Sequence, residues 1–128
     1  MENLKLPVLL IVEDDKENLK YLKLLLRNNF IIEDCDNSDD FHSLINSKAI
    51  DIILMDITIH GSKDGLQLTK ELKSNPKFVN IPIVVLTAHA FQKDKLNATE
   101  VGVDKFLTKP IDGIILRNTL LELIKKNI

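Results

Sequence analysis

The sequence has little of several residue types, and each shortage excludes a class of protein. Its 128 residues include one cysteine and no tryptophan. A single thiol, Cys35, can form neither an internal disulfide nor a cysteine metal cluster, and its place after an apolar run predicts a buried structural thiol. Lys and Arg number 17 against 19 Asp and Glu. Because nucleic-acid binding needs clustered basic charge, we expect no direct contact with nucleic acid.

Long apolar stretches are also missing. No run approaches the ~20 apolar residues that a membrane-spanning helix needs. The first seven residues lack the basic-then-apolar layout of a signal peptide. Hydrophobic residues make up 45% and charged residues 28%, the balance of a globular domain of this length. We therefore expect a single domain over residues 1–128, located in the cytoplasm and without membrane contact.

Five short apolar runs alternate with amphipathic segments along the chain. Strands are expected at 8–12, 30–35, 50–55, 81–86 and 105–108. Helices are expected at 16–28, 38–47, 65–74, 91–101 and 112–127, with Asp15 as the N-cap of the first. The alternation predicts a doubly wound α/β sandwich with a parallel sheet. Strand order 2-1-3-4-5 is one of two common solutions, which periodicity does not distinguish.

The last expected helix is apolar on more than one side. Leu116, Leu120 and Leu123 recur at helical spacing and are expected in the core. At 100° per residue, Ile114 and Leu121 point nearly opposite to them. These two aliphatic side chains are therefore candidates for an exposed contact surface.

Polar residues follow four of the five expected strands. Glu13 and Asp14 come after the first strand, Asp56 after the third, Thr87 at the end of the fourth and Lys109 after the fifth. Because ligands bind outside the carboxyl ends of parallel strands, we expect these side chains to share one site. No histidine or thiol stands among these four strand ends to activate a nucleophile, whereas carboxylate oxygens suit Mg²⁺.

This set of groups suits phosphoryl transfer to a carboxylate. Such a transfer needs an attacking oxygen, a metal that absorbs charge and donors for the phosphoryl oxygens. Here Asp56 would attack, Glu13 and Asp14 would hold Mg²⁺, and Lys109 and Thr87 would bind phosphoryl oxygens. Each residue alone has an ordinary interpretation as a helix cap, turn residue or strand former, but four matched strand ends together favour the site.

The motifs at these strand ends resemble those of the receiver domains of bacterial response regulators. They are LLIVEDD at 9–15, IILMD at 52–56, DG at 64–65, VVLTA at 84–88 and FLTKP at 106–110. Their order and spacing extend the resemblance over nearly the whole chain. It implies a flavodoxin-like (βα)₅ sandwich with a five-stranded sheet in the order 2-1-3-4-5.

The resemblance also implies roles for individual residues. Asp56 would be the phosphoacceptor and Lys109, before a cis Pro110, would contact the phosphoryl group. Glu13 and Asp14 would surround Mg²⁺, or alternatively Mn²⁺. A sensor histidine kinase or a histidine phosphotransfer protein would supply the phosphoryl group.

Further implied roles concern the switch and its output. Thr87 would be the switch hydroxyl, and Phe106 the aromatic whose rotamer reports its state. Thr58 would offer its backbone carbonyl to the metal, and Thr58 and His89 occupy positions that tune acyl-phosphate lifetime. We expect His89 to alter dephosphorylation. A downstream protein, or a second copy in a homodimer, would bind the face formed by the elements at 91–101, 105–108 and 112–127.

Two features depart from the family pattern. The loop after Asp56 is one residue longer than usual and lacks a proline, which leaves the path of residues 57–63 open. We expect Gly61 and Ser62 to absorb the extra residue. The second helix lacks the usual small-residue start, reading Asn37-Ser-Asp-Asp-Phe41, and we regard this difference as neutral.

Three other functions compete with this interpretation. An aspartyl phosphohydrolase typically has a second acid two residues after the nucleophile, where this chain has Thr58, and usually a larger chain. A flavin-binding electron carrier needs a hydroxyl-rich phosphate loop where this chain has three acids. A degenerate receiver acting only as a binding module is the third. The complete set of Asp14, Asp56, Thr87 and Lys109 argues against that last alternative.

Overall fold

The fold is built on a central parallel sheet whose strands alternate with helices along the chain. The computed structural model describes residues 5–57, 61, 63–88 and 91–126. The strands are β1 (Val8–Val12), β2 (Ile31–Cys35), β3 (Ile52–Met55), β4 (Ile83–Thr87) and β5 (Lys105–Thr108). They lie in the order β2-β1-β3-β4-β5, as the resemblance implied, and every neighbouring pair is parallel.

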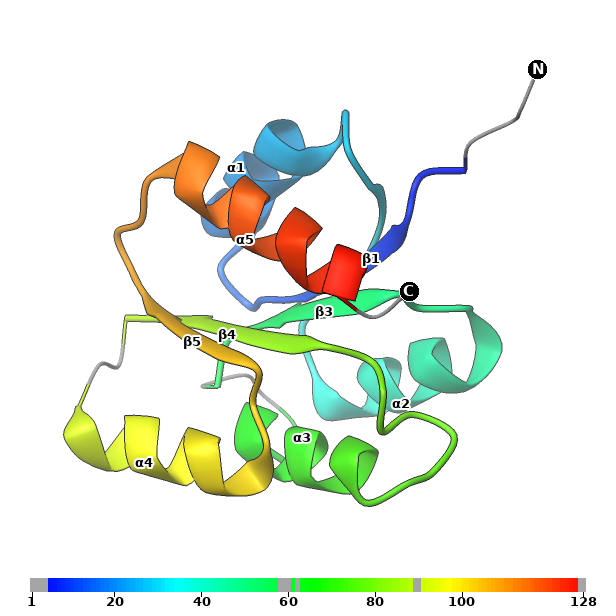
Figure 1. The fold of residues 1–128 in the computed structure, drawn as a ribbon, viewed down its shortest axis with the longest axis vertical. Helices are drawn as coiled ribbons and strands as arrows, with labels where there is room; N and C mark the ends of the chain where they lie inside the picture. Colours follow the sequence, from blue (N-terminus) through cyan, green and yellow to red (C-terminus); the bar gives the residue numbers. More distant parts are fainter. Residues whose placement is uncertain (1–4, 58–60, 62, 89–90, 127–128) are drawn as a thin grey trace.

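Helices cover both faces of this sheet (Figure 1). They are α1 (Lys16–Leu26), α2 (Ser38–Ser47), α3 (Gly65–Lys73), α4 (Gln92–Val101) and α5 (Gly113–Lys126). Helices α1 and α5 lie on one face, and α2, α3 and α4 on the other. None of the described helices is long and apolar enough to cross a membrane.

Two apolar clusters, one for each face, hold the layers together. In β1, Leu10 and Val12 belong to the cluster that includes side chains of α2 and α3. Leu9 and Ile11 belong to the cluster that includes side chains of α1 and α5. Because successive side chains of a strand point to opposite faces, this division requires an uninterrupted apolar run. The continuous runs of the sequence are therefore strands buried on both faces.

Short polar side chains cap the starts of α1, α2 and α3. Asp15 caps α1 as predicted, with Oδ1 accepting the backbone N–H of Glu17 and Asn18. Asn37 caps α2, and Asp64 caps α3 in a capping box with Gln67. These caps set where the three helices start, and so where the strand-to-helix loops before them end.

The predicted outer side of α5 was partly wrong. Ile114 is 59% exposed, as expected, but Leu121 is partly buried and packs with the cluster that contains side chains of α1. The exposed neighbour is instead Ile115, at 57%. Helix α1 packs beside α5 and so covers one flank of α5 that does not face the sheet. A projection of α5 alone cannot show this contact.

Candidate functional site

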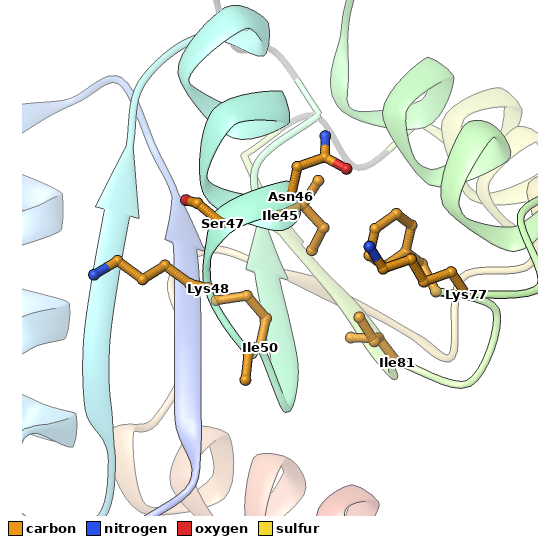
Figure 2. A pocket seen from close by; sticks show the side chains of 9 residues that line it. Ile45, Asn46, Ser47, Lys48, Ile50, Lys77 and Ile81 are labelled. Atoms are coloured by element: carbon orange, nitrogen blue, oxygen red, sulfur yellow. The ribbon is translucent and has the colours of Figure 1, made fainter.

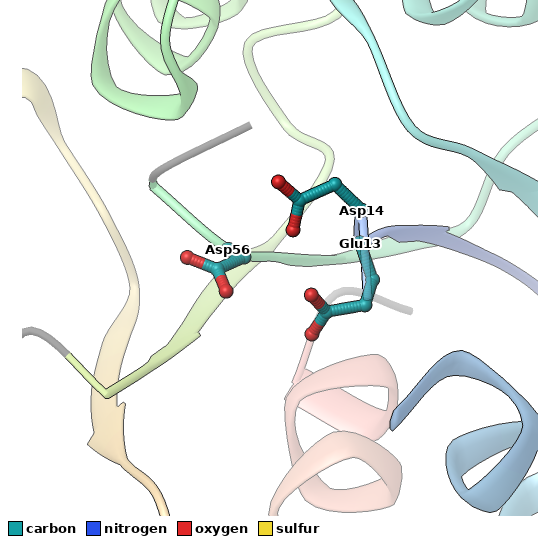
Figure 3. A group of neighbouring side chains, drawn as sticks. All are labelled: Glu13, Asp14 and Asp56. Carbon is teal, nitrogen blue, oxygen red and sulfur yellow. The ribbon is translucent and has the colours of Figure 1, made fainter. Parts of the chain in front are cut away.

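Three carboxylates meet where β1 and β3 end. Glu13 and Asp14 follow β1 directly, and Asp56 follows β3 (Figure 3). One oxygen of each of the three carboxyl groups lies within 4.8 Å of the others. Glu13 is 3% exposed and Asp56 7%, whereas Asp14 is half-buried. The register of β1 and β3 brings them together: Val12 pairs with Met55, and the backbone N–H of Asp56 donates to the Val12 carbonyl at 2.9 Å.

Lys109 reaches this cluster from the end of β5. Its Nζ lies 2.7 Å from Oε1 of Glu13 and 3.1 Å from Oδ2 of Asp56. The backbone N–H of Lys109 donates to the Thr87 carbonyl at 2.9 Å. The Lys109–Pro110 peptide bond is cis, as the resemblance implied. Burial by itself lowers the pKa of the Lys109 ammonium, but the hydrogen bond with Glu13 and the charges of Asp56 and Glu13 outweigh burial and raise it. Lys109 is therefore a cation at neutral pH.

Thr87 completes the surroundings of Asp56. As the last residue of β4, it is fully buried and donates its hydroxyl to Oδ1 of Asp56 at 3.2 Å. The two oxygens of Asp56 thus have different partners, a neutral hydroxyl on Oδ1 and an ammonium on Oδ2. The structure therefore brings together all five side chains that were predicted from their positions at the strand ends: Glu13, Asp14, Asp56, Thr87 and Lys109.

One further residue, Asn18 of α1, belongs to the cluster, although the sequence pattern did not single it out. Its Nδ2 lies 2.5 Å from Oε1 of Glu13, the oxygen that also accepts from Lys109. The only sequence signal was a short amide in the first turn of the helix that follows the acidic pair. Side chains three residues after an N-cap often reach back over the helix start, as Asn18 does here.

Gly65 packs against the backbone that carries Asp56 and Ile57. A Cβ on Gly65 would lie 2.8 Å from the Asp56 carbonyl oxygen and 2.9 Å from Cα of Ile57. The Gly65 N–H also bonds the Ile57 carbonyl at 3.2 Å. The start of α3 can therefore come this close to the end of β3 only where the helix carries no side chain.

Of the remaining predicted site residues, the structure describes only Phe106. Phe106 lies on β5 opposite Val85 in the register and is half-buried. Thr58 and His89 lie outside the described residues, as does most of the lengthened loop. Within that loop, Gly61 has a φ of 112° and a Cβ on it would meet Ser38 Oγ at 2.5 Å, so this part of the loop lies against the start of α2.

The donor set of the cluster suits a hard divalent cation. The cluster offers three closely spaced carboxylates, and the ammonium of Lys109 contacts two of them, Glu13 and Asp56. Mg²⁺ is bound through one or two carboxylates and keeps several waters, which agrees with oxygen donors at a partly open strand edge. Glu13, Asp14 and Asp56 are the residues that could hold it.

One pocket lies near the carboxylates and another lies far from them. A pocket of about 530 Å³, mostly apolar, borders the cluster and is lined by residues that include Asn18, Tyr21, Lys109 and Pro110. Another, of about 380 Å³, lies at the opposite edge of the sheet, where Ile50 and Ile81 precede β3 and β4 (Figure 2).

Comparison with known proteins agrees with this geometry. The family model of the response regulator receiver domain matches residues 9–121. The chain is 44% identical over 85 residues, 65% of its length, to Histidine kinase 1 of Arabidopsis thaliana. It is 31% identical over 80% of its length to the phosphate regulon transcriptional regulatory protein PhoB of Pseudomonas aeruginosa. It spans only 7% and 44% of the lengths of these two relatives.

Solved structures show the same architecture. The receiver domain of a signal transduction histidine kinase from Syntrophus aciditrophicus superimposes with a TM-score of 0.86 at 27% identity, covering 94% of this chain and 91% of that one. The receiver domain of the sensor histidine kinase PA1611 from Pseudomonas aeruginosa gives 0.85 at 26% identity, covering 94% and 99%. That domain has a magnesium ion coordinated in its active-site cleft.

Proposed function

Because this chain belongs to the response regulator receiver domain family, we propose that Asp56 accepts a phosphoryl group in a two-component or phosphorelay system. The donor would be the phosphohistidine of a sensor histidine kinase or of a histidine phosphotransfer protein. The observation that carries the proposal is the environment of Asp56: a buried carboxylate with Thr87 on one oxygen and Lys109 on the other.

The proposed reaction is an in-line displacement at phosphorus. An oxygen of Asp56 forms the new O–P bond while the P–N bond to the donor imidazole breaks, and the imidazole nitrogen leaves with that electron pair. The product is an acyl phosphate on Asp56. Lys109 and Thr87 already contact the two Asp56 oxygens, so short movements would bring both donors onto the transferred phosphoryl oxygens.

Glu13, Asp14 and Asp56 would hold Mg²⁺, with Mn²⁺ as an alternative. That the backbone carbonyl of Thr58 is a further ligand stays a prediction. A bound Mg²⁺ would neutralise charge that builds up between the acceptor carboxylate and the phosphoryl oxygens. The magnesium ion in the cleft of the Pseudomonas aeruginosa neighbour supports this assignment.

The output would be a change in protein contacts rather than catalysis of a separate reaction. Phosphorylation from small donors and loss of the phosphoryl group would be the chain's own chemistry. We propose that Phe106 reports the state of Thr87 and that a downstream protein, or a second copy of the chain, binds the face of α4, β5 and α5. Leu96 on α4 and Ile115 on α5, each more than half exposed, support an apolar contact there.

Several sequence predictions remain part of this proposal. One is that residues 1–128 act as one receiver domain, which the continuous five-stranded sheet supports. Another is that Thr58 and His89 tune the lifetime of the acyl phosphate. Equal phosphoryl half-lives in wild type and His89→Ala would refute the role of His89. A cytoplasmic location also remains a prediction.

The test is the intact mass of the protein after incubation with acetyl phosphate and Mg²⁺. We expect wild type to gain one phosphoryl group, with no gain after chelation of the metal or in Asp56→Asn. Asp39→Asn is a matched control, because Asp39 is an exposed carboxylate at the start of α2, and it should be phosphorylated like wild type. If neither acetyl phosphate nor a panel of phosphorylated histidine phosphotransfer proteins modifies wild type, the chain is a degenerate binding module instead.

A further inference from the structure

Asn18 shares one oxygen of Glu13 with Lys109. Asn18 Nδ2 lies 2.5 Å from Glu13 Oε1, and Lys109 Nζ lies 2.7 Å from the same atom. The other oxygen, Oε2, accepts the backbone N–H of Asp15 at 3.2 Å. Glu13 is 3% exposed, so these three donors take the place of water around its carboxylate.

The proposed phosphoryl transfer would remove one of these donors. Lys109 contacts Glu13 at 2.7 Å and Asp56 at 3.1 Å, so its tighter bond is with Glu13. To bind a phosphoryl oxygen on Asp56, the ammonium must move toward Asp56 and weaken its bond with Glu13. A buried carboxylate that loses a donor is costly unless another donor stays in place.

Asn18 is fixed where it can be that donor. It stands three residues after the N-cap Asp15, and its backbone N–H is held by Oδ1 of Asp15 at 3.2 Å. The start of α1 therefore sets the position of Asn18 independently of Lys109. Its neutral amide also adds no positive charge, so it satisfies Glu13 without competing with a cation for the three carboxylates.

We propose that Asn18 is a positioning residue that holds Glu13 in place for the divalent cation while Lys109 transfers from Glu13 to the phosphoryl group. This inference rests on the proposed function and adds a residue to it. Without Asn18, Glu13 would depend on Lys109 alone for its Oε1. The carboxylate would then be less well placed for the metal, and the ammonium would be slower to leave.

The test compares Asn18→Ala and Asn18→Asp with wild type, using two measurements on each protein. The first is the Mg²⁺ dissociation constant, from the amide NMR shifts of the residues around Asp56 during titration. The second is the rate of phosphorylation by acetyl phosphate at saturating Mg²⁺. Asn46→Ala is the matched control, because the Asn46 amide makes one similar hydrogen bond, to the His42 carbonyl on α2, remote from the carboxylates.

We expect Asn18→Ala to weaken Mg²⁺ binding and to slow phosphorylation, each by about tenfold, the usual scale for residues that orient metal ligands. Asn18→Asp keeps the shape of the side chain but adds a carboxylate. It should bind Mg²⁺ at least as tightly as wild type and still be phosphorylated more slowly, because two acids then retain Lys109. A residue that only caps the helix would not separate affinity from rate in this way.

The outcomes separate the inference from the function on which it rests. If wild type is phosphorylated and both Asn18 variants match it within about twofold in affinity and rate, Asn18 is only part of the helix start and the inference fails alone. If wild type accepts no phosphoryl group from any donor, the proposed function fails and the inference falls with it. Should Asn18→Ala not fold, the shape-conserving Asn18→Asp decides by whether its phosphorylation rate falls while its Mg²⁺ affinity is kept or increased.

Discussion

Lys109 holds its ammonium 2.7 Å from Oε1 of Glu13, although the two residues are 96 positions apart in sequence. The pair joins the ends of β1 and β5, two strands that are not neighbours in the sheet. Asp56, at the end of the strand β3 between them, shares the same ammonium at 3.1 Å. One side chain thus balances two buried carboxylates, and this arrangement makes the stability of the site depend on cations.

Replacing Lys109 by methionine should therefore destabilise the protein in a way that Mg²⁺ corrects. Removing one partner of a buried ion pair leaves uncompensated charge, and we expect a loss of about 1–3 kcal/mol in unfolding free energy, since Lys109 is partly exposed. Mg²⁺ should bind the variant more tightly than wild type, because no ammonium competes for the carboxylates. Urea unfolding with and without Mg²⁺ measures both effects.

The control for this experiment is Lys105→Met, which removes an exposed lysine of β5. It should leave stability and its Mg²⁺ dependence nearly unchanged. A loss in Lys109→Met that stays the same at all Mg²⁺ concentrations would show that the carboxylates do not form the cation site.

The ion pairs of Glu71 should contribute a small stability that disappears in acid. Hydrogen bonds from Lys63 and then from His42, whose Nε2 lies 2.9 Å away, lower the pKa of the Glu71 carboxyl. A lowered pKa in the folded state stabilises the protein above the ordinary glutamate pKa, and this contribution is lost as the pH falls through the folded value. Because Glu71 is well exposed, we expect Glu71→Gln to cost no more than about 1 kcal/mol at neutral pH.

Unfolding of wild type and Glu71→Gln by urea, from about pH 7 to about pH 3, measures this contribution. The difference between the two proteins should shrink toward zero at the acid end of the range. A difference that grows as the pH falls would contradict the assigned direction of the shift.

Cys35 should be unreactive in the folded protein. Burial, followed by the charge of Asp40, raises the pKa of its thiol to about 12, and its side chain is 6% exposed at the end of β2. Because the thiolate is the reactive form, alkylation by iodoacetamide at mildly alkaline pH should be slower than in the urea-unfolded chain by about a hundredfold or more. Rapid labelling of the native protein, followed by mass spectrometry, would show that the end of β2 opens readily.

Gly65→Ala should disturb both stability and phosphoacceptance. The added methyl group would lie 2.8–2.9 Å from the Asp56 carbonyl oxygen, Cα of Ile57 and the sulfur of Met55, so the end of β3 and the start of α3 must separate. Overpacking of this kind typically costs about 1–3 kcal/mol. Since the displaced backbone carries Asp56, we also expect slower phosphorylation by acetyl phosphate.

Gly113→Ala tests whether any crowded glycine has this effect. Its methyl group would meet mainly the flexible side chain of Leu25, at 2.8 Å, which can move aside. This variant should lose some stability but be phosphorylated at the wild-type rate. Equal rates in Gly65→Ala and wild type would show that the position of Asp56 tolerates the shift.

The sequence predicted most of the fold and the main members of the site for a physical reason. Strand burial on both faces requires a continuous apolar run, and a helix on the sheet requires an apolar stripe, so both leave local patterns. The carboxyl ends of parallel strands meet at one edge, so residues that directly follow the strands, such as Asp56 and Lys109, could be assigned together. The predicted helix cap at Asp15 was also confirmed, because capping depends on neighbouring residues alone.

What depends on packing between elements could not be predicted. Leu121 was expected to be exposed, but it packs on the flank of α5 that adjoins α1, while Ile115 is exposed instead. Asn18 was not singled out, because an amide in a first helical turn has many uses and only the direction of α1 brings it to Glu13.

The amino-acid sequence by itself thus determined the alternation of strands and helices along the chain, the helix cap at Asp15 and the kinds of group that reach the carboxyl edge of the sheet. Only the tertiary structure decided how those groups pair: Lys109 with both Glu13 and Asp56, Thr87 with Asp56, and Asn18 with Glu13. The reason is the range of the interactions. Periodicity and capping act within a few residues, whereas these contacts join side chains from different elements at distances that are set only when the layers pack together.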